Sequence, residues 1–318
     1  MRILSQRDQK WHKTAPDNMT YGVFSKFENS EDQVFIPSEE YKEFKFKNSS
    51  NTSSKLLNAT HLIDEKEKLR YANMVRKTVD MLKESTVQKV VLSRVESFTK
   101  RSSDLEILEA LLNEYPAANC YFFHHPKVGK WMGATPEILA VIKGENLQTM
   151  SLAGTAVFNP NQDHVWGEKE IEEQKLVTDF IVENLKAKGV SHIKKSLVQT
   201  AQAGTLVHLK TDINALIDPS RKEDYIEALH PTPAVCGLPR DAAQKFIKDN
   251  EGYDRSFYTG YLGIVEEREA SYYVNLRCMQ LLDDEAYLYV GGGITAKSDP
   301  ILEYEETVQK LFTMKSLL

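Results

Sequence analysis

The stretch of residues 258–292 reads YTGYLGIVEEREASYYVNLRCMQLLDDEAYLYVGG. We predict three strands in direct succession within it, over residues 258–267, 270–282 and 285–292. The last two strands flank Asp283-Asp284, a pair typical of a hairpin turn. Across the rest of the chain, helices are inserted between strands irregularly, which favours an α+β fold over a regular βαβ alternation.

Apolar periodicity and turn residues predict the remaining elements. Helices are expected over residues 64–84, 103–115, 165–188, 221–229, 240–250 and from 300 to the end. Strands are expected over residues 88–99, 118–125, 137–143 and 146–153. The first 60 residues are polar and weakly patterned, and KNSSNTSSK (47–55) is typical of an exposed loop. We therefore expect an N-terminal segment, residues 1–60, that packs on one large domain, residues 61–318.

Composition excludes several classes of protein. The 318 residues are 41% hydrophobic, which is enough for a sizeable core. Their net charge of −6 argues against a nucleic-acid-binding protein, which normally has a clustered basic surface. There is no apolar run of the roughly 18 residues that a membrane-spanning helix needs. The N-terminus, MRILSQRDQKWHKT, lacks the apolar core of a signal peptide. Three widely spaced cysteines, Cys120, Cys236 and Cys278, indicate reduced thiols and a cytoplasmic protein.

Two carboxylates lie in an apolar stripe of the predicted helix over residues 165–188. At about 100° per residue, Glu170 and Glu173 share a face with Trp166, Val177, Phe180 and Ile181. Glu172 lies on the opposite face. A buried carboxylate is costly, so each must be protonated, paired with a cationic group or bound to a metal cation. Two interpretations stay open: a pair at the stripe's edge that reaches solvent, or a site for a hard cation such as Mg²⁺.

The predicted final helix carries acidic residues on the face that periodicity assigns to solvent. Its core stripe is predicted to comprise Ile301, Tyr304, Val308, Leu311 and Phe312. Glu303, Glu306 and Lys310 share roughly the opposite face, at spacings i, i+3 and i+7. Periodicity alone therefore predicts a solvated acidic surface on this helix.

Several segments can bring polar groups to a site, although each also has a simpler structural interpretation. SLAGT (151–155) and the triple glycine at 291–293 can bring backbone amides close to an anion, but neither is specific. HPTPAVCG (230–237) is stiff and turn-rich, which is also typical of a structural corner. Lys89 and Glu137 each begin a predicted strand, where a surface charge is the simplest explanation.

Taken together, eight segments resemble those of the chorismate-utilising enzymes, and specifically of isochorismate synthases. They are KVVLSR (89–94), GATPEIL (133–139), LAGT (152–155), KEIEEQ (169–174), HPTPAVCG (230–237), RSFYTG (255–260), NLRC (275–278), and GGGI with SDPILEYEETVQK (291–310). The similarity extends from Lys89 to the C-terminus, in the family's order. It implies a single α+β domain with two antiparallel sheets packed as a sandwich and helices outside. It also implies an enzyme that acts on chorismate and needs Mg²⁺.

The resemblance implies a site of carboxylates, cations and backbone amides. Glu173 and Glu306 would bind Mg²⁺, and Glu170 and Glu303 would support it directly or through water. Arg277 and Lys310 would bind the substrate carboxylates. Further substrate contacts would come from Tyr258, Gly154, Thr155, Ala234, Gly291 and Gly293. For Glu306, the resemblance overrides the solvent position that periodicity predicts.

The resemblance also implies the chemistry. In the branch of the family that adds water, Lys89 corresponds to the general base for a water that attacks C2 of the ring. Glu137 corresponds to the general acid for the departing C4 hydroxyl. Lys89 together with Ala153 favours water addition over amination. Ala234, where salicylate synthases usually carry threonine, favours an enzyme that stops at isochorismate.

Two alternatives stay open within the family. A salicylate synthase would eliminate pyruvate after forming isochorismate, and an isochorismate synthase can also serve a siderophore pathway. No carrier domain accompanies the motifs, which favours menaquinone biosynthesis. We expect a monomer without a glutaminase subunit, a nucleic-acid partner or a membrane partner. The region before residue 60 shows no family motif, which leaves the number of N-terminal strands open.

Overall fold

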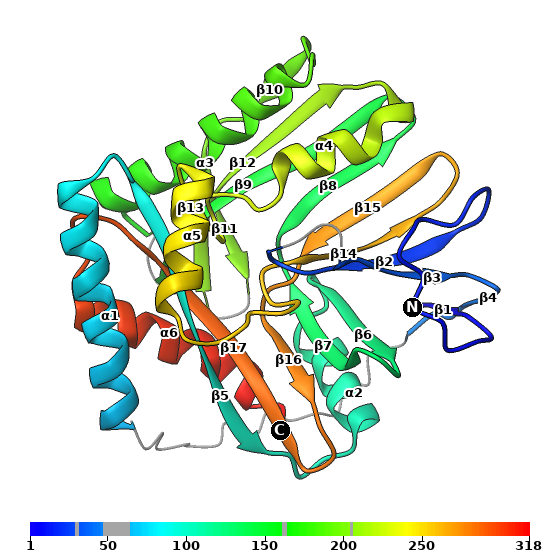
Figure 1. Cartoon of the computed structure of the whole chain (residues 1–318), viewed down its shortest axis with the longest axis horizontal. Helices are drawn as coiled ribbons and strands as arrows, with labels where there is room; N and C mark the ends of the chain where they lie inside the picture. Colours follow the sequence, from blue (N-terminus) through cyan, green and yellow to red (C-terminus); the bar gives the residue numbers. More distant parts are fainter. Residues whose placement is uncertain (29–31, 47–63, 161–163, 204–205) are drawn as a thin grey trace. The chain divides into compact units, whose positions relative to one another are not determined.

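A computed structural model describes residues 1–318 except 29–31, 47–63, 161–163 and 204–205. The described chain divides into two compact units, each assembled from three stretches of sequence. Figure 1 labels their helices and strands. Unit 1 comprises Met1–Lys45, Thr135–Ala234 and Arg255–Asn275, and unit 2 comprises Phe46–Ala134, Val235–Asp254 and Leu276–Leu318. The loop expected at 47–55 and the boundary expected at residue 60 fall outside the described residues.

Unit 1 is built on a nine-stranded antiparallel sheet. Its order is β10-β12-β9-β8-β15-β14-β2-β3, with β11 also paired to β12, and β1 and β4 form a separate pair. The strands are β1 (Arg2–Ser5), β2 (Tyr21–Ser25), β3 (Val34–Pro37), β4 (Glu40–Glu43), β8 (Ile138–Lys143), β9 (Asn146–Val157), β10 (Ile193–Lys195), β11 (Gln199–Ala203), β12 (Leu206–Leu216), β14 (Tyr261–Val265) and β15 (Glu269–Val274). The helices are α3 (Glu168–Ala187), the 3-10 turn η2 (Pro219–Arg221) and α4 (Lys222–Leu229). Helix α3 packs on β9 and β12, and α4 packs on β8.

Unit 2 is built on a six-stranded antiparallel sheet of order β13-β5-β17-β16-β7-β6. The strands are β5 (Lys89–Thr99), β6 (Asn119–His125), β7 (Gly129–Thr135), β13 (Gly237–Leu238), β16 (Cys278–Leu281) and β17 (Glu285–Ile294). The helices are α1 (Glu65–Glu84), α2 (Asp104–Glu114), α5 (Arg240–Asn250) and α6 (Pro300–Lys315). Helices α1 and α6 pack together and against β17, and α5 packs on β5. Its apolar core includes Ile107, Met132, Met279, Leu288 and Leu311.

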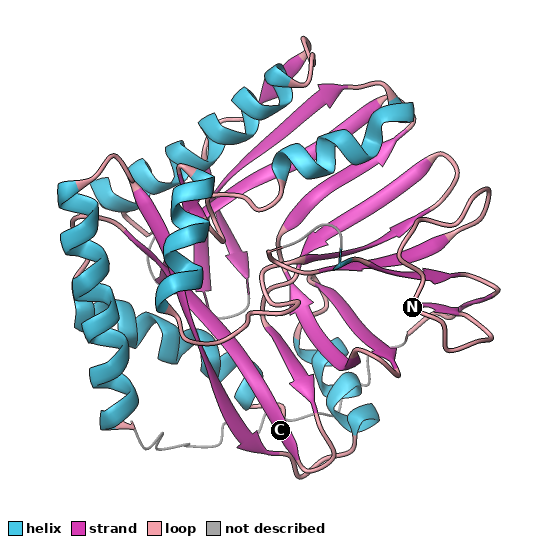
Figure 2. Cartoon of the chain, viewed as in Figure 1, coloured by secondary structure: helices cyan, strands magenta, loops and turns pink. Residues whose placement is uncertain are grey.

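The α+β class is confirmed, because antiparallel sheets alternate irregularly with helices (Figure 2). The stretch that suggested this class contains four strands, however, since the strand predicted over 270–282 is interrupted. Arg277 has a φ of 46°, which no regular strand allows. The two halves, β15 and β16, consequently pair within different sheets.

Several strands were not predicted, among them β7 and the set β10, β11 and β12. In β12 the signal was present, because Val207, Leu209, Ile213 and Ala215 are buried at alternate positions. The hairpin at Asp283-Asp284 is confirmed by the antiparallel pairing of β16 with β17. The predicted start of α2 is also confirmed, since Ser103 and Glu106 form a reciprocal capping box.

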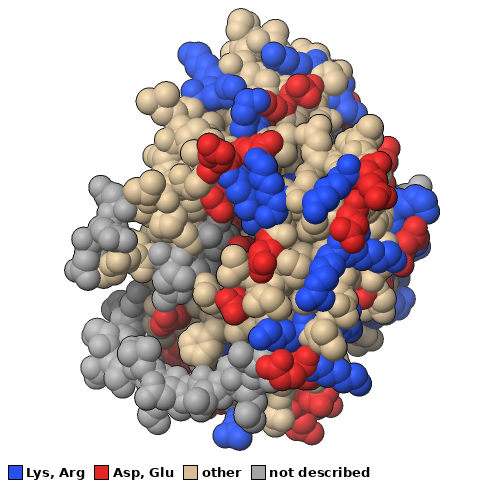
Figure 3. Space-filling model, turned by 90° about the vertical axis from the view of Figure 1, so that its left-hand side faces the viewer, with Lys and Arg blue, Asp and Glu red and all other residues tan. Residues whose placement is uncertain are grey.

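The surface and the helices add two observations. On the face drawn in Figure 3, Lys and Arg side chains are interspersed with Asp and Glu side chains. Among the described residues, no helix combines the length and the apolar character needed to cross a membrane.

Candidate active site

Lys89 is the first residue of β5, and its side chain is fully buried. On one side, β13 pairs with the start of β5, and the N–H of Val91 donates to the carbonyl of Cys236 at 2.8 Å. On the other side, β17 pairs with β5. A Cβ on Gly237 would collide with the Lys89 carbonyl, so glycine permits this close approach of β13. Lys89 is therefore an interior residue, and the surface explanation for it is wrong.

Glu137 directly precedes β8 and is only 4% exposed. Its N–H donates to Thr135 Oγ1 at 3.3 Å, and its carbonyl accepts from the N–H of Val274 at 3.1 Å. The pairing of β8 with β15 shifts register beside this point, between Tyr272 and Tyr273. Such irregularities bend a strand and redirect neighbouring side chains. Glu137 is thus a buried carboxyl group at an irregular strand start, and the surface explanation is wrong for it too.

The LAGT segment forms a second irregularity, in β9. Register with β12 shifts between Val207 and Leu209, where Gly154 and Thr155 together face His208. Gly154 has a φ of +69°, and its carbonyl lies 2.9 Å from Nδ1 of His208. Left-handed glycine is typical of such bulges. Thr155 belongs to β9, but its side chain lies outside the described part of the chain.

The two carboxylates of α3 lie at the border of its buried face. Glu170 and Glu173 are partly exposed, whereas Glu172 is exposed, as predicted. The apolar stripe is confirmed by the burial of Val177, Phe180 and Ile181. A Cβ on Gly154 would lie 3.1 Å from the Cβ of Glu170. Glu170 therefore packs closely against the glycine bulge of β9.

Gln174 holds α3 against the sheet of unit 1 and was not predicted as a site residue. It is 3% exposed. Its Nε2 lies 3.0 Å from Ser151 Oγ, 3.0 Å from Thr178 Oγ1 and 2.7 Å from Thr211 Oγ1. These hydroxyls come from β9, α3 and β12, so the network restricts rotation of α3 and the direction of its carboxylates. A polar residue inside a predicted apolar stripe was the signal available in the sequence.

Gly154→Ala is expected to impair activity through Glu170. The new methyl group must enter a left-handed residue, which costs about 1–2 kcal/mol of folding free energy, and must also displace Glu170. We expect at least a tenfold loss of chorismate turnover, measured alongside urea unfolding.

Gly144→Ala is the matched control, because Gly144 also has a positive φ, +56°, but nothing lies within 4 Å of its added Cβ. It should show a similar loss of unfolding free energy with unchanged turnover. Equal turnover in the two variants would contradict the role given to the Gly154–Glu170 contact.

The buried face of helix α6 is shifted from the one that periodicity predicts, although Tyr304 and Leu311 of the predicted stripe are buried. Glu303 is 3% exposed and Thr307 is fully buried, whereas Ile301 and Phe312 are 36% and 38% exposed. The predicted solvent position of Glu303 is therefore wrong. The reason is a tertiary contact, since a Cβ on Gly292 of β17 would lie 3.4 Å from Glu303 Oε2. A glycine at this point of the sheet leaves space for a carboxylate.

Glu306 and Lys310 interact with each other on the same helix. Their Oε1 and Nζ atoms are 2.7 Å apart, and their side chains are 27% and 23% exposed. Lys310 Nζ also donates to the carbonyl of Gly291 at 3.1 Å, which joins α6 to the triple glycine of β17. Gly293 follows two residues later in β17. The predicted acidic surface is thus a partly buried ion pair next to a strand.

The other predicted substrate contacts lie in turns or between strands. Tyr258 is 3% exposed, and it lies between Ser256 and Thr259, both of which have positive φ. Arg277 also has a positive φ and separates β15 from β16, and burial lowers the pKa of its guanidinium group. Ala234 is partly exposed. Non-glycine residues with positive φ are uncommon and are enriched at functional sites.

The four predicted metal ligands are all carboxylates. They form one i, i+3 pair on α3 and one on α6, and in each pair one glutamate packs against a glycine of a neighbouring strand. Oxygen-only donor sets suit hard cations such as Mg²⁺. Within the described ranges, no three His, Cys, Asp or Glu side chains are gathered as a metal centre. What fits Mg²⁺ is thus the residue type of the four ligands, since all four supply carboxylate oxygens.

Comparison with known sequences identifies the family. The profile described as "Chorismate binding enzyme" matches residues 13–318. Isochorismate synthase EntC of Escherichia coli K12 is 31% identical over 277 residues, which cover 83% of this chain and 70% of EntC. Isochorismate synthase MenF of Pasteurella multocida is 29% identical over 274 residues, which cover 81% of this chain and 63% of MenF. The α+β fold is thus that of a chorismate-utilising enzyme.

The chain belongs to the chorismate-binding enzyme family. Among solved structures, it is similar to the menaquinone-specific isochorismate synthase MenF of Escherichia coli, with 27% identity and a TM-score of 0.72. That match covers 79% of this chain and 61% of MenF. Anthranilate synthase component I of Streptococcus pneumoniae TIGR4 shares the fold, with a TM-score of 0.75, 18% identity and coverage of 98% of this chain and 82% of that one.

Proposed function

We propose that the protein is a Mg²⁺-dependent isochorismate synthase. The observation that carries the proposal is the complete burial of Lys89 at the start of β5, whose first six residues are all buried. Burying the polar end of a lysine side chain costs folding free energy, so its presence here favours a chemical role over a structural one. The similarity to isochorismate synthases from several bacteria supports the same reaction.

In the proposed reaction, Lys89 and Glu137 act on two different oxygens. Lys89 Nζ accepts a proton from water, whose oxygen forms the new bond to C2 of the chorismate ring. The C1=C2 bond becomes C1=C6, the C5=C6 bond becomes C4=C5, the C4–O bond breaks, and Glu137 donates a proton to the leaving hydroxyl group. One water enters and one leaves, so the product is an isomer and no oxidant or reductant is needed. General acid–base catalysis of this kind contributes about 10²–10⁴-fold to a rate.

Glu173 and Glu306 would hold the Mg²⁺ ion, with Glu170 and Glu303 as further ligands or as partners of bound water. When bound, Mg²⁺ supplies positive charge that neutralises a substrate carboxylate. We propose that Lys310 exchanges partners during binding, leaving Glu306 for a carboxylate of chorismate. Arg277 would bind a carboxylate through two parallel hydrogen bonds. Backbone amides at Gly154, Thr155, Gly291 and Gly293, with Tyr258 and Ala234, would complete the contacts.

Product analysis tests this proposal. We expect the protein to convert chorismate into isochorismate with Mg²⁺, to stop when EDTA is added, and to recover when Mg²⁺ is restored. Chromatography identifies the product. Accumulation of salicylate with pyruvate would instead establish a salicylate synthase. Turnover that needs ammonia and gives an aminated product would show that the assignment of water addition is wrong.

We propose menaquinone biosynthesis as the pathway, with siderophore biosynthesis as the alternative. The similarity to the menaquinone-specific isochorismate synthase MenF of Escherichia coli supports the first. The similarity to the vibriobactin-specific isochorismate synthase of Vibrio cholerae supports the second. The two pathways are separated by expressing the protein in one bacterial strain that lacks its menaquinone-specific isochorismate synthase and in another that lacks its siderophore-specific one. We expect the menaquinone deficiency to be corrected.

A further inference from the structure

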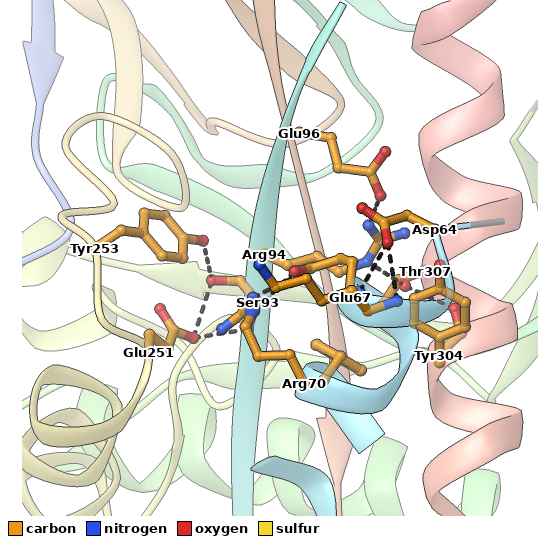
Figure 4. A network of polar contacts seen from close by, with 12 residues as sticks. Asp64, Glu67, Arg70, Ser93, Arg94, Glu96, Glu251, Tyr253, Tyr304 and Thr307 are labelled. Carbon is orange, nitrogen blue, oxygen red and sulfur yellow. Dashed lines mark hydrogen bonds and ion pairs between the residues drawn. The ribbon is translucent and has the colours of Figure 1, made fainter. Parts of the chain in front are cut away.

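Arg94 lies on the same strand as Lys89 but is not explained by the proposed chemistry. Its side chain is fully buried. Alternate residues of a strand point to opposite faces, so Arg94 and Lys89 lie on opposite faces of β5. A buried guanidinium group is costly unless it is well paired. Its partners therefore indicate what it contributes (Figure 4).

The main partners of Arg94 belong to α6. Its Nε donates to Thr307 Oγ1 at 2.8 Å, and Thr307 Oγ1 donates in turn to the carbonyl of Tyr304 at 2.7 Å. The guanidinium carbon lies 4.9 Å from the centre of the Tyr304 ring, a cation–π contact. Its Nη1 pairs with Glu96. Arg94 of β5 thus contacts two residues of α6, Thr307 and Tyr304, that lie about one helical turn apart.

These contacts determine how far α6 is rotated about its own axis. With about 100° per residue, Glu303, Lys310 and Glu306 lie about 40°, 60° and 100° to one side of Thr307. Tyr304 lies about 60° to the other side. A rotation of about 20° moves an atom at the side-chain radius of a helix by about 2 Å. The Arg94 contacts at Thr307 therefore affect the direction in which Glu303, Glu306 and Lys310 point.

Tyr71 of α1 also packs near Tyr304 of α6. Its ring lies 6.2 Å from that of Tyr304, and its hydroxyl donates to the carbonyl of Leu92 at 3.4 Å. Burial and then the charge of Glu303 raise the pKa of Tyr71, whereas Arg94 acts in the opposite direction. Glu303 and Tyr71 also face the same glycine, because a Cβ on Gly292 would lie 3.4 Å from Glu303 Oε2 and 3.7 Å from the Tyr71 hydroxyl oxygen.

We propose that Arg94 is a positioning residue that works through Thr307 and Tyr304. It holds α6 at the rotation in which Glu306 and Lys310 serve the cation and the substrate carboxylate. This inference rests on the proposed function, because it assigns a purpose to the direction of the same two side chains. Misplacing such groups by about 1 Å can reduce a rate by about 10²-fold.

Thr307→Val tests the proposal, since it keeps the shape of the side chain and removes the oxygen that Arg94 contacts. We expect the dissociation constant for Mn²⁺, followed by electron paramagnetic resonance, to rise at least fivefold, and kcat to fall about tenfold. Arg94→Lys retains a positive charge but not the planar group, and it should cause the same two changes. The second variant provides the test if the first does not fold.

Thr78→Val is the matched control. Thr78 is also fully buried on a helix of unit 2, and its Oγ1 donates to the carbonyl of Met74 at 2.8 Å, a hydrogen bond that stays within α1. We expect Mn²⁺ affinity and kcat within twofold of wild type. Equal values for Thr307→Val and Thr78→Val, with the wild type active, would overturn the positioning role alone. An inactive wild type that binds no Mn²⁺ would overturn the proposed function, and the positioning role with it.

Discussion

Lys89→Met is expected to lower kcat for isochorismate formation by about 10³-fold, within the range for loss of a general base. Methionine retains the length and apolar stem of lysine but cannot accept the proton of the attacking water. Because the Lys89 side chain is fully buried, no base on the protein surface can directly take over its role. We expect the free energy of unfolding to rise, because methionine has a similar volume and removes the cost of burying the amine of Lys89. Stopped assays with chromatography, together with urea unfolding, measure both quantities.

Lys100→Met is the matched control for this prediction. Lys100 directly follows the other end of β5, and its Nζ pairs with Asp104 at 2.6 Å. Asp104 also pairs with Lys130 at 2.8 Å, so one partner remains after the substitution. We expect a loss of about 1 kcal/mol in unfolding free energy and unchanged kcat. Undiminished water addition by Lys89→Met would show that another group is the base.

Glu137→Gln is expected to reduce kcat by about 10²–10⁴-fold, the usual contribution of a general acid. The amide has nearly the same shape, but it is not an effective proton donor to the C4 oxygen. Glu137 is 4% exposed, and the backbone contacts that hold it do not involve its carboxyl group. The KM for chorismate should therefore change less than kcat. Steady-state kinetics at saturating Mg²⁺ separates the two parameters.

Glu251→Gln distinguishes loss of a proton donor from loss of any buried carboxyl group. Glu251 is 3% exposed, and its Oε1 accepts from the N–H and the hydroxyl of Ser93 at 2.7 and 2.9 Å. Weakening these hydrogen bonds should lower the free energy of unfolding by about 1–3 kcal/mol and leave kcat within threefold. If Glu137→Gln retained full activity, the assignment of the acid would be wrong.

Local patterns predicted much of this protein. The apolar stripe of α3, the exposed Glu172 and the start of α2 at Ser103 follow from local sequence alone, and all three are confirmed. The order of the motifs identified the family, which the match over residues 13–318 confirms. These features could be predicted because each depends on residues that are close in sequence.

Other features depend on residues that are far apart in sequence. The strand predicted over 270–282 is divided between two sheets, because Arg277 adopts a left-handed backbone conformation. Gln174 and Arg94 were not predicted as site residues, since their partners lie on other elements. From sequence alone, a polar side chain is assigned to the surface, because burial requires hydrogen-bond partners that the sequence does not reveal.

The sequence by itself determined the class of fold, the family and the identity of the candidate base and acid, Lys89 and Glu137. Only the tertiary structure decided that these two groups are buried and which face of α6 lies inside. Periodicity assumes that charged residues avoid the core. Glu303 is nevertheless buried, because Gly292 leaves space for its carboxylate and Arg94 holds the helix through Thr307. Burial of a polar group is decided by the partners that folding brings to it, and no local pattern contains them.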